Sequence, residues 1–172
     1  MDLFLVDQNV ELVECWKREF AAFPEVTIMR ENILAVARNA IVSPANSYGY
    51  MDGGIDRFYV EHFGDQLQVT VMDAISRCPE GFLPVGASLI VRTGDKKIPY
   101  LIVSPTMLLP EPVRAVNCFH AMSAILRIAR QYADIIDKIF CPGLGTGVGQ
   151  VPYSKAAKEM ALAYEKWKQA VD

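Results

Sequence analysis

Residues 39–57 read NAIVSPANSYGYMDGGIDR and bring a short apolar strand, an asparagine, paired glycines and a carboxylate into one segment. The apolar residues 40–42 are followed by a proline and later by a glycine, which is typical of a buried strand that ends in a loop. Gly53 and Gly54 then precede residues 55–60, where apolar side chains resume a helical period. The glycine amides are therefore expected at a helix N-terminus, which attracts phosphate oxygens, and the segment predicts a nucleotide-diphosphate site.

A second glycine-rich loop follows a second apolar strand. After the apolar residues 139–141, the chain reads PGLGTGVG at 142–149, and alternating glycines allow a backbone to wrap closely around an anion. No Lys-Ser or Lys-Thr pair follows, which disfavours a P-loop, and the late position does not fit the first turn of a Rossmann dinucleotide site. The loop therefore predicts a backbone phosphate site of another kind, with a flexible turn after a strand as the alternative.

Strand-like runs alternate with helix-like segments along the whole chain, which predicts an α/β sandwich. The length of 172 residues, 52% of them hydrophobic, fits one domain spanning 1–172. Residues 92–97 are expected to form the turn of a hairpin. We expect strands at 3–6, 26–29, 40–43, 87–91, 101–104 and 139–141, and helices at 10–20, 55–63, 66–77, 113–132 and 154–171.

Composition narrows the possible partners. A formal charge of -3 gives no long-range attraction for a polyanion, so nucleic acid is an unlikely partner. Four scattered cysteines and two histidines form no metal-binding motif, and we expect no metal and no cofactor. The N-terminus carries neither a signal peptide nor an apolar run long enough for a membrane span, so we expect no membrane partner and a cytoplasmic location.

Three short motifs resemble those of the macro domain family, an α/β module that binds ADP-ribose. They are Ser43-Pro-Ala-Asn46, Gly54-Ile-Asp56 and Gly145-Thr-Gly-Val148, which occur in the family's order and spacing. Residues 83–90 and 100–106 also resemble the family's middle strands, so the likeness covers most of the chain. The resemblance implies a three-layer α/β/α sandwich with a mixed, mostly parallel sheet and ADP-ribose, free or conjugated, at the C-terminal ends of the strands.

The resemblance also implies roles for individual residues. The interval from Asn46 to Asp56 equals that in the hydrolase branch of the family, where this asparagine contacts the distal ribose and this aspartate assists hydrolysis. From the residues alone, Asn46 could instead cap a turn and Asp56 could interact with a helix dipole. The predicted catalytic residues are Asn46 and Asp56, and the predicted ligand-binding residues are Asn32, Ser43, Gly53, Gly54, Ile55, Gly145, Thr146, Gly147, Val148 and Gly149.

The chain departs from the family pattern at four positions in or near the predicted site. Ser43 replaces the first asparagine of the motif, Asn32 an aspartate that contacts adenine, and Gly149 an aromatic residue that packs on the distal ribose. Asp52 stands where the hydrolase branch has glycine and brings negative charge close to the expected phosphates. Two functions therefore stay open: hydrolysis of ADP-ribosylated substrates, and a non-catalytic module that binds ADP-ribose or another phosphorylated nucleotide.

Overall fold

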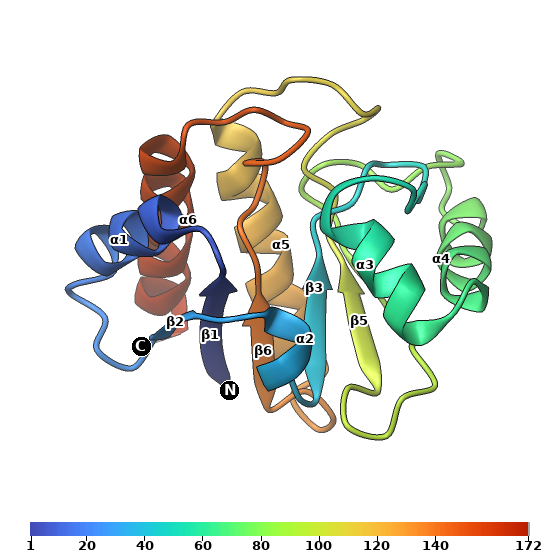
Figure 1. Cartoon of the computed structure of the whole chain (residues 1–172), viewed down its shortest axis with the longest axis horizontal. Helices are drawn as coiled ribbons and strands as arrows, with labels where there is room; N and C mark the ends of the chain where they lie inside the picture. The colour runs from blue at the N-terminus through green and yellow to red at the C-terminus, as the bar shows by residue number, and fades with distance from the viewer. Residues whose placement is uncertain (172) are drawn as a thin grey trace.

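The computed structural model describes residues 1–171, and at its centre lies a six-stranded sheet with the order β2-β1-β6-β3-β5-β4 (Figure 1). All neighbouring strands run parallel except β4 and β5, which form the antiparallel hairpin expected around residues 92–97. The prediction of a mixed, mostly parallel sheet is confirmed. The strands are β1 (Asp2–Asp7), β2 (Thr27–Arg30), β3 (Ala40–Ser43), β4 (Leu89–Arg92), β5 (Tyr100–Val103) and β6 (Lys138–Cys141).

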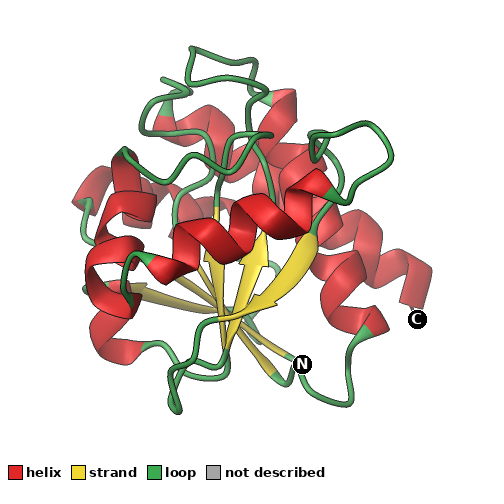
Figure 2. Ribbon diagram, turned by 90° about the vertical axis from the view of Figure 1, so that its right-hand side faces the viewer, coloured by secondary structure: helices red, strands yellow, loops and turns green. Residues whose placement is uncertain are grey.

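Helices cover both faces of the sheet and complete a three-layer sandwich (Figure 2). Because successive side chains of a strand point to opposite faces, Leu3 and Leu5 of β1 pack in one core while Val6 packs in the other. The first core contains α1 (Val10–Glu19), α5 (Val116–Gln131) and α6 (Tyr153–Val171). The second contains α2 (Ile33–Val36), α3 (Gly54–Phe63) and α4 (Gln66–Ser76).

Two helices differ from the sequence-based expectation. The short helix α2 was not predicted, because four residues are too few to show a helical period. Helix α5 begins at Val116 rather than Val113, and the backbone N–H of Val113 donates to the carbonyl of Gly149 in the second glycine loop. Within residues 1–171, none of the helices combines the length and the apolar character needed to cross a membrane.

The order of the strands brings the two glycine-rich loops together. Strands β3 and β6 are parallel neighbours, with Ile41 paired to Phe140. Both strands therefore end at the same edge of the sheet, and the loops that follow them leave side by side (Figure 1). Strand β1 lies on the other side of β6, so Asp7, its last residue, reaches the same edge.

Candidate functional site

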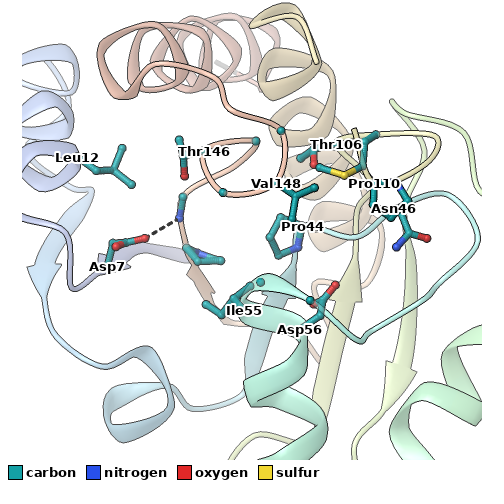
Figure 3. Close-up of a pocket in the computed structure, with 18 of the residues that line it drawn as sticks. Asp7, Leu12, Pro44, Asn46, Ile55, Asp56, Thr106, Pro110, Thr146 and Val148 are labelled. Carbon is teal, nitrogen blue, oxygen red and sulfur yellow. Dashed lines mark hydrogen bonds between the residues drawn. The ribbon is translucent and has the colours of Figure 1, made fainter. Parts of the chain in front are cut away.

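The two glycine-rich loops enclose one cavity of about 300 Å³ at this edge of the sheet (Figure 3). Asp7 and Leu12 line one end of the cavity, while Asn46, Asp56 and Thr106 lie toward the other. The two loops, which are about 90 residues apart in the sequence, thus line the same cavity. Among the predicted residues, the structure brings together Asn46, Gly53, Gly54, Ile55, Asp56, Gly145, Thr146, Gly147, Val148 and Gly149.

The first loop offers the start of a ten-residue helix. Helix α3 begins at Gly54, and its N-cap, Gly53, makes no side-chain capping bond. The N–H groups in the first turn of a helix have no acceptor within the helix, and the helix dipole adds partial positive charge there. These amides are thus free to bind an anion in the cavity.

The second loop offers another set of free amides. The carbonyls of Gly145, Gly147 and Gly149 accept hydrogen bonds from Val151, Gln150 and Val113, which fixes the loop. Among the hydrogen bonds of residues 1–171, the backbone N–H groups of residues 145–149 are not donors. A loop that is fixed through three of its carbonyls and whose amides are free is suited to hold an oxyanion.

The glycines of the second loop occupy their positions for different structural reasons. A Cβ on Gly149 would lie 2.7 Å from the carbonyl oxygen of Gly145, which explains why no aromatic side chain stands at this position in the loop. Gly145 has φ +69° and packs against Cys118, so a side chain there would be strained and crowded. Gly147, by contrast, has open space where its side chain would be.

Asp56 is a buried acid in the cavity wall, with 6% of its surface exposed. Removal from water raises the pKa of its carboxyl group from 3.8 to about 7, against the opposing effect of a hydrogen bond from Ser43. Ser43 Oγ donates that bond to Asp56 Oδ1 at 2.6 Å. Within the described chain the second carboxyl oxygen has no hydrogen-bond partner, so it is available to a ligand or a water molecule.

Ser43 does not line the cavity, because it is itself 1% exposed and lies behind Asp56. As the last residue of β3, Ser43 points to the same face of the sheet as Ile41, where α3 packs. A direct contact between Ser43 and a ligand, as the sequence suggested, does not follow from this position. Its hydroxyl contacts Asp56 instead.

The side chain of Asn46 lines the cavity but also holds its own loop. Asn46 Oδ1 accepts from the backbone N–H groups of Tyr48 and Tyr50, and Nδ2 donates to the carbonyl of Tyr50 at 2.8 Å. This is the turn-forming role considered as an alternative for Asn46. One hydrogen on Nδ2 is left over for a second partner.

Asn32 lies in an adjoining cavity of about 300 Å³. The two cavities share Asp7 and Ile55 in their walls, so they lie next to each other at the edge of the sheet. Asn32 caps α2, because its Oδ1 accepts from the N–H of Leu34, and its Nδ2 group remains available. Phe58 of α3 lines the same cavity and is 59% exposed, which provides an aromatic surface beside Asn32.

Among the described residues, those with ionisable side chains in the wall of the main cavity include the acids Asp7, Asp52 and Asp56 but no lysine or arginine. Asp52 is exposed, and Asp7 accepts hydrogen bonds from the N–H groups of Asn9 and Gly143. Among residues 1–171, no three His, Cys, Asp or Glu side chains are grouped as a metal site would require. An anion in the cavity would thus depend on backbone amides.

The family is decided by a match over most of the chain. The family model of the Macro domain matches residues 42–160. The chain belongs to the macro domain family. An uncharacterized protein of Aquifex aeolicus is 30% identical over 144 residues, which cover 83% of this chain and 82% of that protein. An uncharacterized protein of Aeropyrum pernix is 31% identical over 135 residues, which cover 77% of this chain and 66% of that protein.

Solved macro domains share the fold of this one. The macrodomain of Mycobacterium tuberculosis DarG has a TM-score of 0.67 at 20% identity, with 79% of this chain and 87% of that chain covered. An Oceanobacillus iheyensis macrodomain solved with ADP has a TM-score of 0.64 at 19% identity, and the match covers 75% of this chain and 68% of that chain. Thermosipho africanus DarTG, solved with ADP-ribose, has a TM-score of 0.66 at 13% identity; the match covers 92% of this chain and about half (49%) of that one.

The residues that line the cavity of this macro domain but were not predicted from the sequence include Asp7, Thr106 and Tyr153. Asp7 ends an apolar strand, and Thr106 follows another by three residues. Position just after a buried strand is a signal that could have found both, because strand ends line the sites of α/β sheets. Tyr153 starts α6 and accepts a hydrogen bond from Asn9 Nδ2, a contact across 144 residues that no local pattern shows.

Proposed function

We propose that this macro domain binds ADP-ribose, with the diphosphate on the backbone amides of its two glycine-rich loops. The observation that supports this most is that both sets of free amides belong to loops that line a single cavity, in which none of the described lining residues is lysine or arginine. A diphosphate carries several acceptor oxygens and can use donors from two sides. The solved relatives with ADP and with ADP-ribose support the same choice of ligand.

The two neighbouring cavities support one orientation of the ligand. The adenine would lie in the second cavity, on the exposed ring of Phe58 and within reach of the Asn32 amide. The distal ribose would then lie beyond the loops, beside Asn46 and Asp56. In this orientation the spare hydrogen on Asn46 Nδ2 would donate to a ribose hydroxyl.

Hydrolysis at the distal ribose is the finer part of the proposal. A water oxygen would attack C1 of that ribose, its proton would pass to Asp56, and the leaving group would depart with the electrons of the broken bond. A base is most effective when its pKa lies near the working pH, and the pKa of about 7 meets this condition. Because only the ionised carboxyl can accept the proton, the rate should rise with pH through about 7.

A binding module without turnover is the second candidate. It is favoured by Asn46, whose amide is already engaged in three hydrogen bonds with its own loop and therefore has limited freedom to follow a reacting ribose. In that case, Asp56 would orient the distal ribose rather than accept a proton. Both candidates share the binding step.

Calorimetric titration with ADP-ribose tests the shared step, with AMP as the control ligand. Saturable binding of ADP-ribose and weaker binding of AMP are expected, because AMP lacks the diphosphate and the distal ribose. Asn46→Ala is not a clean test of a ligand contact, since it also removes three loop bonds. Absence of any heat with ADP-ribose would reject the proposal.

Turnover of an ADP-ribosylated peptide by the Asp56→Asn variant separates the two candidates. Asparagine keeps the size of the side chain and the oxygen that accepts from Ser43, but it cannot take up a proton from water. If the protein is a hydrolase, Asp56→Asn should lose at least about 100-fold in rate, as expected for loss of a general base, and keep most of its ADP-ribose affinity. Equal turnover by the variant and the unchanged protein would remove Asp56 from the catalytic role.

A further inference from the structure

The pairing of Ser43 with Asp56 has a geometry that only the fold reveals. The two residues are 13 positions apart and come from β3 and α3. Both are buried, and the Oγ–Oδ1 distance of 2.6 Å is within the range of a charge-assisted bond between a hydroxyl and a carboxylate. Ser43 pairs with Val103 of β5, and its carbonyl accepts a hydrogen bond from the N–H of Ser104, so the Ser43 backbone is held on this side of the strand.

We propose that Ser43 is a positioning residue, whose hydroxyl fixes the orientation of the Asp56 carboxyl group and favours its ionised, proton-accepting form. The inference rests on the proposed function where it concerns turnover, but its effect on ionisation can be measured without a ligand. A hydroxyl that donates to a carboxylate stabilises the charged form. With Oδ1 held by Ser43, the other oxygen is directed to the cavity, where a water would bind.

Two titratable groups near this pair, Tyr59 and Cys141, do not ionise near neutral pH. Tyr59, one turn along α3, is fully buried and donates to the carbonyl of Val42, and burial raises the pKa of its hydroxyl well above 10. Burial likewise raises the pKa of the Cys141 thiol on β6. The other carboxyl groups in the cavity wall are those of Asp7 of β1 and Asp52. The titration of Asp56 is therefore identified by comparison with the Asp56→Asn variant.

The test is a carboxyl ¹³C NMR titration of Asp56, assigned by the loss of its signal in Asp56→Asn. In Ser43→Ala the midpoint should move to higher pH, by about a tenfold change in proton affinity, because a hydrogen bond to a charged group is removed. Ser43→Thr keeps a hydroxyl and should keep the midpoint. Ser104→Ala is the matched control, since Ser104 is also a buried serine, just after β5, but donates to the carbonyl of Ala121.

A second readout is the pH profile of turnover. At pH 7, Ser43→Ala should be about fivefold slower than the unchanged protein and should recover near pH 9, where Asp56 is ionised in both. A merely structural role would lower the rate equally at every pH. An unmoved Asp56 midpoint in Ser43→Ala, or an equal movement in Ser104→Ala, would overturn the inference.

These outcomes are separate from the fate of the proposed function. A moved midpoint in a protein that does not bind ADP-ribose would support the role of Ser43 in ionisation and reject only the ligand. Binding and turnover with an unmoved midpoint would support the function and reject the role of Ser43.

Discussion

Replacement of Asp56 by asparagine should stabilise the protein at high pH and not at low pH. The pKa of Asp56 is raised from 3.8 to about 7 because the carboxyl group is buried. Between these two values the folded chain holds a proton that the unfolded chain has released, so the contribution of Asp56 to stability falls as pH rises. Above pH 7 both states are ionised and the contribution is constant.

The size of the effect follows from the same two pKa values. Each pH unit between them corresponds to about 1.4 kcal/mol, so ionised Asp56 destabilises the folded state by about 4 kcal/mol at pH 8. Asparagine has the shape of the protonated acid but never ionises. The free energy of unfolding of Asp56→Asn should therefore exceed that of the unchanged protein by up to about 4 kcal/mol at pH 8, with little difference at pH 4.

Urea denaturation at intervals from pH 4 to pH 8 measures this difference, and subtraction removes the titration of all other groups. Asp52→Asn is the matched control, because Asp52 precedes the same helix but is exposed, and its difference should change little with pH. A difference between Asp56→Asn and the unchanged protein that does not depend on pH would refute the reasoning. It would mean that the carboxyl group is solvated in the folded protein.

Two further predictions concern the walls of the cavity. Gly145→Ala should lower the free energy of unfolding by about 1–3 kcal/mol, because alanine is strained at φ +69° and its Cβ would lie 2.9 Å from Cys118 Sγ. Gly147→Ala, which places its Cβ in open space, should change the free energy of unfolding by less than about 1 kcal/mol. Equal losses for the two variants in chemical denaturation would contradict this. Thr106→Val should not destabilise the protein, since the buried Thr106 hydroxyl has no hydrogen-bond partner among the described residues, and a lower melting temperature would reveal a partner.

The fold was predictable because its signals are local. Each of the six strands is an apolar run bounded by polar or turn residues, and all six lie where they were expected. The start of α5 could not be predicted, because the bond between Val113 and Gly149 joins positions far apart in the chain. Helix α2 has a side-chain cap at Asn32 but is too short to show a periodic pattern.

In the candidate site, too, the local motifs were predictable and the contacts between distant residues were not. The glycine-rich loops are contiguous motifs, and their meeting in one cavity follows from the parallel pairing of β3 with β6. The bond between Ser43 and Asp56 requires that β3 and α3 face each other at one register, which no spacing specifies. Asp7 illustrates the limit most clearly, since its partner Gly143 is 136 residues away.

The most direct test of the central claim is titration with ADP-ribose of two variants at one position, Gly147→Glu and Gly147→Gln. Gly147 lines the cavity and has room for a side chain, so both variants should fold as the unchanged protein does. If the loop amides hold a diphosphate, the charged glutamate should weaken binding at least about tenfold more than the neutral glutamine of the same size. Equal affinities for the two variants would contradict a diphosphate at this loop.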